Sequence, residues 1–154
     1  MTTNPAGLVY GVLAVATVIA AESTRRETFG KLFLASVVTM VLYWVAHAYA
    51  RQWASRYTKA GEWSLAELTA SFVHEVSILA GAALPTSVLL VSWAAGASTE
   101  TAVTAVLWTA GVELLLLEVL PGIRNGLRLR DLALQTLLGV SMGVGILGLR
   151  VVLH

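Results

Sequence analysis

The sequence of 154 residues contains no cysteine and few charged residues. The lack of cysteine excludes disulfides, thiolate metal ligands and cysteine nucleophiles. Charged residues make up 12% of the chain, compared with roughly 25% in soluble domains. Ten lysines and arginines nearly balance nine acidic residues, so the net charge of +1 gives no electrostatic basis for binding nucleic acid. These absences argue against a soluble domain and against nucleic acid as a partner.

Hydrophobic residues, in contrast, make up 57% of the chain, and the mean hydropathy is +0.78. A helix needs about 20 apolar residues to cross the hydrocarbon core of a bilayer. The sequence has five such segments, at residues 5–21, 32–50, 72–96, 101–120 and 132–153. We therefore expect an all-α fold, a single polytopic transmembrane helix bundle over residues 1–154, with the lipid bilayer as its partner.

The third segment belongs to a longer predicted helix. Ser64 followed by Glu67 matches a capping box, which predicts a helix start, and the pattern continues to Gly96. Such a helix of about 30 residues would measure ~45 Å, too long for a perpendicular span. We expect its first turns to lie at the membrane interface and Pro85 to kink it near the middle of the membrane. The bundle then has five spans, or four full spans and one kinked, partly interfacial helix. The fourth segment should close at Pro121.

The loops carry most of the positive charge. With five spans, the second and fourth loops lie on the same side of the membrane. The rest of the chain outside the spans holds fewer basic residues than these two loops. The loops hold six: Arg51, Arg56, Lys59, Arg124, Arg128 and Arg130. Positive loops favour the cytoplasmic side, so we expect a multi-pass protein of the inner (plasma) membrane with a cytoplasmic N-terminus.

Two histidines stand near the second loop. Tyr43, His47 and Arg51 are spaced to share one face of the second helix, and we expect this face to point into the bundle. His74 and Glu75 occur where the chain re-enters the membrane from the same loop. The two histidines therefore have a similar predicted depth and are candidates for a common site.

The fourth segment carries two glutamates, Glu113 and Glu118. A five-residue spacing places them about 140° apart around a helix, so a single site faces at most one of them directly. An ionised carboxylate at the bilayer centre costs at least ~2.5 to 3.5 kcal/mol. Glu113, the deeper of the two, should therefore be neutral, paired or in contact with water.

Three alternative functions are compatible with these residues. The first is a small channel or transporter for protons or cations, with His47 and His74 as a titrating gate and Glu113 as a deep relay. The second is a membrane redox component that binds a divalent metal or haem b, with His47, His74 and Glu75 as candidate ligands. The third is an accessory or structural protein in which these side chains are interhelical hydrogen-bond partners. We favour the first, which requires no cofactor. The sequence contains none of the common hydrolase or nucleotide-binding motifs that would indicate an enzyme.

Glycines mark expected helix contacts. Gly7 and Gly11 form one small-xxx-small pair, and Gly139 and Gly143 form another. Such pairs allow close approach of two backbones, within one chain or between chains. Five helices enclose little space, so a transport role favours a homo-oligomer.

Three stretches resemble a known group of proteins. They are YWVAHAYA from Tyr43 to Ala50, Val73-His74-Glu75, and Leu117-Glu118. The chain resembles, over most of its length, small integral membrane proteins of actinobacteria that have no assigned activity. The resemblance implies a bacterial inner-membrane protein and implies nothing about mechanism.

Overall fold

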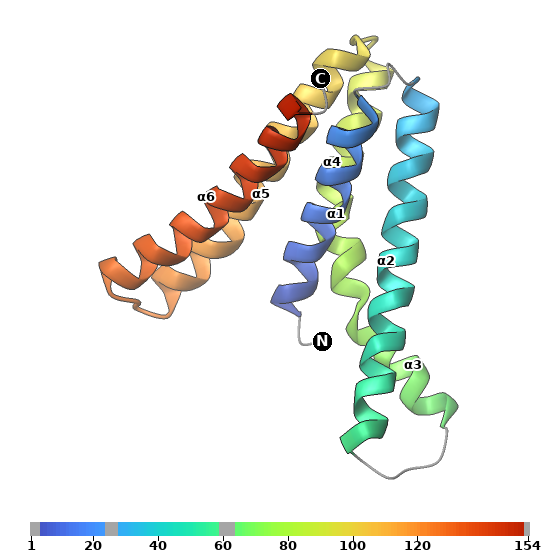
Figure 1. Cartoon of the computed structure of the whole chain (residues 1–154), viewed down its shortest axis with the longest axis vertical. Helices are drawn as coiled ribbons and strands as arrows, with labels where there is room; N and C mark the ends of the chain where they lie inside the picture. The colour runs from blue at the N-terminus through green and yellow to red at the C-terminus, as the bar shows by residue number, and fades with distance from the viewer. Residues whose placement is uncertain (1–3, 24–27, 59–63, 153–154) are drawn as a thin grey trace.

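The computed structural model describes residues 4–23, 28–58 and 64–152, and every regular element in these ranges is a helix (Figure 1). Within them, the description leaves out the side chains of residues 23, 56–58, 135, 142, 143, 146, 147 and 149–152. In chain order the helices are α1 (Pro5–Ser23), α2 (Phe29–Thr58), α3 (Leu65–His74), α4 (Val76–Ala94), α5 (Thr99–Arg124) and α6 (Leu129–Val152). The predicted all-α fold is confirmed.

Four helical stretches are long and apolar enough to cross a membrane. They are α1, α2, α3 together with α4, and α5. These four stretches support the expectation of a multi-pass membrane protein. Helix α6 has 24 residues, or ~36 Å of helix, which suffices for a span by length. A fifth span at residues 132–153 stays a prediction, because α6 is described only in part.

The predicted continuous helix from residue 64 to 96 is wrong in one respect, because it is interrupted at Glu75. This residue has φ −85° and ψ 1° and lies between α3 and α4. Helix α4 continues through Pro85, which is buried. The interruption therefore lies near the start of the apolar stretch, where we expected none, and the kink expected at Pro85 stays a prediction. Ser64 does precede the first helical residue, but its side chain makes no capping hydrogen bond.

The end of α5 also differs from the prediction. The helix passes through Pro121 and ends at Arg124. It stops because Gly126 adopts a positive φ of 65°, and the Leu127 amide then donates to the Gly122 carbonyl at 3.0 Å. Glycine reaches this conformation without the steric cost that other residues meet, which makes it a common helix terminator.

The helix order places loops at two ends of the molecule (Figure 1). The start of α1, the end of α2 and the turn between α5 and α6 lie toward one end. The turn between α4 and α5 lies toward the other, together with the start of α2. The end of α2 and the turn between α5 and α6 therefore lie toward the same end of the molecule (Figure 1), and the side of the membrane that they face stays a prediction.

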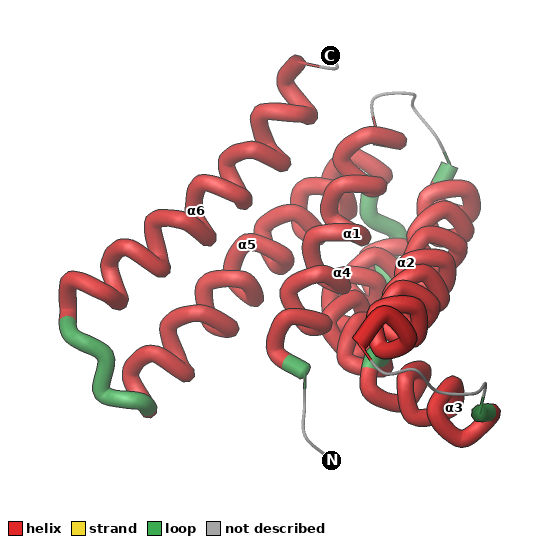
Figure 2. The backbone as a smooth tube through the Cα atoms, turned by 60° about the horizontal axis from the view of Figure 1, so that its bottom comes forward, coloured by secondary structure: helices red, strands yellow, loops and turns green. Residues whose placement is uncertain are grey.

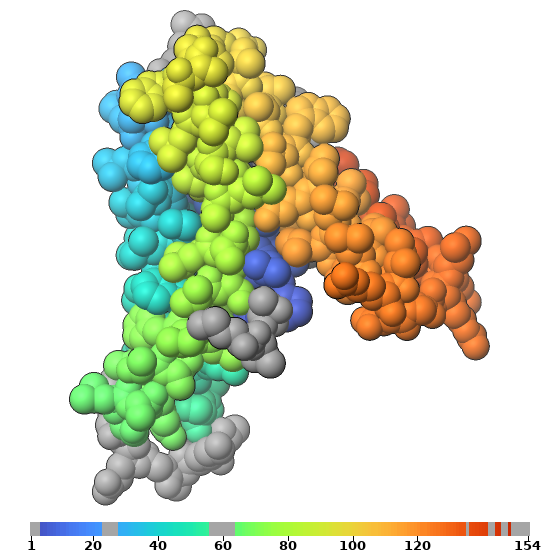
Figure 3. Space-filling view, turned by 180° about the vertical axis from the view of Figure 1, so that it is seen from behind, coloured from blue at the N-terminus to red at the C-terminus, as the bar shows by residue number. Residues whose placement is uncertain are grey.

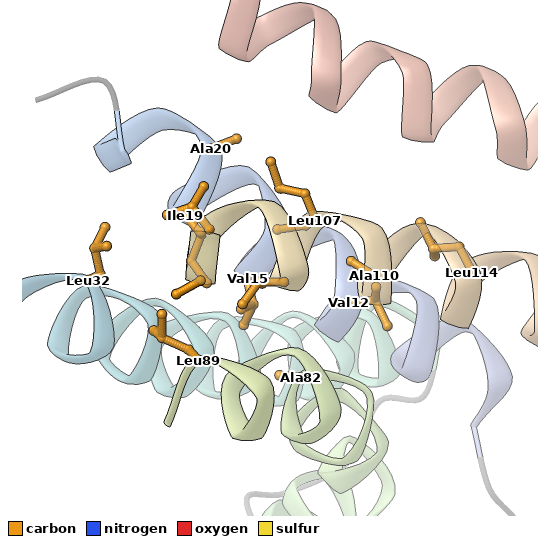
Figure 4. Packing of buried hydrophobic residues seen from close by; sticks show 14 residues of the cluster. Val12, Val15, Ile19, Ala20, Leu32, Ala82, Leu89, Leu107, Ala110 and Leu114 are labelled. Atoms are coloured by element: carbon orange, nitrogen blue, oxygen red, sulfur yellow. The ribbon is translucent and has the colours of Figure 1, made fainter. Parts of the chain in front are cut away.

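Helix α1 is the centre of the core. It packs against α2, α4, α5 and α6. Its buried residues Val12, Val15 and Ile19 meet Leu89 of α4 and Leu107 of α5 (Figure 4). All of these side chains are aliphatic, so this contact region holds the helices together through close packing alone.

Gly7 and Gly11 allow α1 to approach α4 closely. A Cβ added at Gly11 would meet the Ile78 carbonyl oxygen, and one added at Gly81 would meet the Leu8 carbonyl oxygen. At Gly7 an added Cβ would lie 3.0 Å from the Cβ of Ser77. This glycine pair thus serves a contact within one chain. Gly143 lies among the side-chain positions outside the description, so its predicted packing role is not addressed.

The helices form two arms. The four-helix part, α1 to α4, makes one, and α5 with α6 makes the other, which we call the α5–α6 arm. Seen from behind, the α5–α6 arm diverges from the four-helix part (Figure 3). Helix α3 turns away from the line of α4 beside the end of α2 (Figure 2). Each arm carries its own set of ionisable residues.

Candidate functional site

The interruption at Glu75 places a carboxylate inside the four-helix part. Glu75 is only 5% exposed. Its amide donates to the Ser71 carbonyl at 3.1 Å, and its own carbonyl accepts from the Ile78 amide at 3.0 Å, so the backbone remains paired across the break. A buried carboxylate is costly unless it is hydrogen-bonded or ion-paired. The neighbours of Glu75 meet this requirement.

Three side chains contact the Glu75 carboxylate. Arg51 Nη1 of α2 donates to Oε1 at 3.1 Å, and His74 Nδ1 lies 3.2 Å from the same oxygen. Asn4 Nδ2 donates to Oε2 at 3.2 Å, while the Asn4 amide donates to Ser77 Oγ at 3.0 Å. We call these five residues, Asn4, Arg51, His74, Glu75 and Ser77, the Glu75 cluster. Both carboxylate oxygens have partners, and the cluster joins the start of α1 to α2, α3 and α4.

Helix α3 is also fixed directly to α2. Ser71 Oγ donates to Gln52 Oε1 at 3.2 Å in a buried contact. The Trp44 indole donates to the Phe72 carbonyl at 3.0 Å, and the two rings pack edge to face with centroids 5.1 Å apart. The carbonyls in the last turn of a helix lack partners within the helix. Trp44 supplies such a partner from a neighbouring helix.

His47 lies in an aromatic environment one helical turn from Arg51. Its ring centroid is 5.0 Å from that of Tyr10 and 4.7 Å from that of Tyr43. Its Nδ1 lies 2.9 Å from the Tyr43 carbonyl oxygen. In the described residues, His47 and His74 share neither a hydrogen-bond partner nor a ring contact. These contacts give each histidine its own partners, and the predicted common site of the two histidines stays a prediction.

The predicted inward face of α2 is only partly buried. His47 is half-buried, but Tyr43 is 39% exposed and the Arg51 side chain is 47% exposed. Across the described ranges, no group of three or more His, Asp or Glu side chains is arranged to hold a metal ion. The candidate metal set of His47, His74 and Glu75 thus lacks the necessary geometry.

The α5–α6 arm holds the second set of ionisable residues, Glu113 and Glu118. In each, Oε2 is shielded from solvent and has no hydrogen-bond partner in the described structure. The Glu118 carboxylate lies against the backbone of Gly139 on α6, where an added Cβ would overlap its atoms. Gly139 therefore makes room for a carboxyl group, whereas we expected it to make a helix–helix backbone contact.

Sequence reasoning identified Arg51, His74 and Glu75 but missed Asn4 and Ser77. Asn4 is separated from Glu75 by 71 residues and from Ser77 by 73. The position of an asparagine directly before Pro5 marks a helix start, and the Leu8 amide does donate to the Asn4 carbonyl at 3.3 Å. That local signal says nothing about which distant residue the side chain meets.

No protein-family model, curated protein or solved structure matches this chain. The resemblance to small actinobacterial membrane proteins therefore stays a prediction.

Proposed function

We propose that this protein moves protons or cations across a membrane, with the carboxyl groups of Glu113 and Glu118 as the binding groups within the bilayer. The Glu75 cluster lies at one end of the pathway, where Arg51 and His74 set the charge around Glu75. No cofactor takes part. His47 and Tyr43 form an aromatic contact beside this end rather than a gate shared with His74.

One observation carries the proposal. Two carboxyl groups lie on a helix of membrane-spanning length, and each has a shielded oxygen without a partner. An ionised carboxylate in hydrocarbon is strongly disfavoured unless a cation or a donor compensates its charge. Each group is therefore most stable when it holds a proton or binds a cation. Groups that must gain or lose such a charge partner are the usual members of intramembrane ion paths.

Proton flux into liposomes tests the proposal. Purified protein is reconstituted with a pH-sensitive dye inside, and a potassium gradient with valinomycin drives protons inward. We expect Glu113→Gln and Glu118→Gln each to lower the flux at least about tenfold, as for loss of a positioned proton-transfer group. Glu100→Gln is the matched control, because Glu100 is exposed in the first turn of the same helix. Equal flux in the wild type, both variants and protein-free liposomes would refute the proposal.

A structural or accessory role is the second candidate for the Glu75 cluster alone. Its carboxylate is fully paired, which is the arrangement expected of groups that fix a fold. Under this alternative, Glu75→Gln lowers stability and leaves the flux unchanged. Under the transport proposal, it changes both.

The proposed setting is the bacterial inner membrane, with the N-terminus in the cytoplasm and a homo-oligomer as the working form. The positive charge of the second and fourth loops supports this orientation. Because the chain has no cysteine, a single cysteine substitution can report the orientation of its loop directly. In spheroplasts, a membrane-impermeant maleimide should label Gly96→Cys, which lies between α4 and α5. It should not label Asn125→Cys, which lies between α5 and α6. Cross-linking of the reconstituted protein tests for the oligomer.

A further inference from the structure

We propose that the turn between α5 and α6 binds the headgroup of an anionic phospholipid, such as phosphatidylglycerol. The turn joins Arg124, the last residue of α5, to Leu129, the first residue of α6 (Figure 1). This site does not depend on the transport proposal, because it uses neither Glu113 nor Glu118. Its evidence is a set of unpaired arginines, the start of α6 and the apolar side chains beside the arginines.

Three arginines lie within seven residues of this turn. Arg124, Arg128 and Arg130 are all exposed. In the described structure, none of their side chains forms an ion pair or a hydrogen bond. Asp131 is the only acidic residue after Glu118, so three arginines and one aspartate leave two positive charges in excess. The turn is therefore a basic patch whose charge no other part of the described structure compensates.

Arg51 is an arginine toward the same end of the molecule, but its charge is compensated. Its Nη1 atom lies 3.1 Å from Glu75 Oε1. That ion pair joins α2 to the junction of α3 and α4, so Arg51 has a partner within the fold. The arginines of the α5–α6 turn have no such partner in the described structure, which leaves their guanidinium groups available to an external anion.

The start of α6 also favours an anion. The first amides of a helix lack acceptors within the helix and carry partial positive charge. At the start of α5, Ser98 Oγ accepts a hydrogen bond from the Thr101 amide at 3.2 Å. The corresponding position before α6 is Arg128, whose side chain has no acceptor atom. A phosphate group supplies acceptors both for these amides and for the neighbouring guanidinium groups.

The apolar side chains of the turn favour a lipid over a soluble anion. Helix α5 is long and apolar enough to cross a membrane and ends at Arg124, which in a bilayer places the turn at the level of the headgroups. Ile123 and Leu127 are exposed, and Leu129 is 87% exposed. A soluble phosphate would leave these side chains in water, whereas a phospholipid covers them with its acyl chains. A zwitterionic lipid would leave the excess positive charge uncompensated, so the headgroup is anionic.

Quenching of a fluorophore in the turn tests this site. Asn125→Cys gives the cysteine-free chain one labelling position there, and the labelled protein is reconstituted in phosphatidylcholine vesicles. A small fraction of either phosphatidylglycerol or phosphatidylcholine carries a nitroxide on its acyl chain, close to the headgroup. We expect the association constant of phosphatidylglycerol to exceed that of phosphatidylcholine at least about fivefold, which is the contribution of roughly one basic residue near anionic lipid.

Ala95→Cys, labelled in the same way, is the matched control. Ala95 is exposed in the turn between α4 and α5, toward the opposite end of the molecule (Figure 1), and should show no preference for either lipid. In the Asn125→Cys protein, combined replacement of Arg124, Arg128 and Arg130 with glutamine should abolish the preference. Combined replacement with lysine should retain most of it, because lysine also binds phosphate, as a point charge. Circular dichroism verifies that both variants remain helical, and the comparison of the two lipids on unaltered arginines requires no substitution among them.

Three results would overturn the proposed site. Equal quenching by the two lipids at Asn125→Cys, or the same preference at Ala95→Cys, would mean that the turn does not select anionic lipid. A preference that survives the glutamine substitutions would mean that the arginines do not bind the headgroup. If inorganic phosphate removes the preference and sodium chloride of equal ionic strength does not, the turn binds free phosphate instead of a lipid.

Discussion

Glu75 in the four-helix part and Glu118 in the α5–α6 arm are chemically identical residues in opposite situations. Glu75 is buried, and Arg51, His74 and Asn4 satisfy both of its carboxylate oxygens. Glu118 has a shielded oxygen without a partner in the described structure and rests on a glycine. Both sites shield carboxylate oxygens from solvent, but hydrogen bonds and an ion pair replace the lost solvation of both oxygens only at Glu75.

This difference indicates that Glu75 serves mainly the stability of the fold, whereas Glu118 suits the proposed function. A fully paired carboxylate makes its largest contribution to holding its neighbours in place. An unpaired carboxylate destabilises the fold, and proteins keep such groups where a ligand or a proton supplies the missing partner. The four-helix part therefore resembles a fixed scaffold, and the proposed function assigns the exchange of a charge to the α5–α6 arm.

The largest expected effect comes from the glycine contact that holds the scaffold together. Gly11→Ala should destabilise the protein by about 1–3 kcal/mol or more, because the added methyl group meets the backbone of α4 at Ile78, which cannot move aside like a flexible side chain. Thermal unfolding in detergent, followed by circular dichroism, measures the change. Gly30→Ala is the control, since nothing lies within 4 Å of its added Cβ. Equal stability of the two variants would show that α1 and α4 do not pack closely.

The next effect concerns the paired glutamate. Glu75→Ala should cost about 1–3 kcal/mol, because Asn4 and His74 lose their partner. The exposed Arg51 side chain adds little, since its charge is largely screened by solvent. Glu67→Ala on the exposed surface of α3 should change stability by less than about 0.5 kcal/mol. If Glu75→Ala unfolds at the same denaturant concentration as Glu67→Ala, the Glu75 cluster is not a structural contact.

The unpaired glutamate should respond in the opposite direction. Glu118→Leu should stabilise the protein by about 1 kcal/mol, because it removes a shielded oxygen that has no hydrogen bond. The same substitution should abolish proton flux. A gain of stability with loss of function would sharpen the contrast with Glu75. A loss of stability as large as that of Glu75→Ala would show that Glu118 also has a structural partner.

The positions of the helices followed from hydropathy, but their interruptions did not. Pro85 has the stronger local signal for an interruption, yet the helix assignment of α4 continues through it, close to the contact of Gly81 with α1. The break at Glu75 is accompanied by contacts from α2 and from the start of α1. Such contacts are tertiary, and no pattern within the segment itself records them. Pro121 likewise lies within a helix that ends at a glycine turn.

Some of the candidate residues meet in the structure, and others have separate partners. Arg51, His74 and Glu75 meet as a polar group at the end of the second loop, which their sequence positions favoured. The histidines do not share partners, because His47 packs against Tyr10 of α1. Helical periodicity places a residue on a face of its own helix, but which neighbour covers that face depends on how all the helices pack.

The smallest expected effect tests how α3 is held to the scaffold. Trp44→Phe keeps an aromatic ring beside Phe72 and removes the indole donor to the Phe72 carbonyl, which should cost about 0.5–1.5 kcal/mol. The loss should be local, so hydrogen exchange should increase in α3 and remain unchanged in α5. Trp93→Phe is the matched control, because Trp93 is exposed at the far end of α4. Faster exchange throughout both arms would contradict a local effect and would mean that α3 is part of the core that joins the two arms. Equal exchange in the Trp44 and Trp93 variants would mean that the Gln52 contact holds α3 without Trp44.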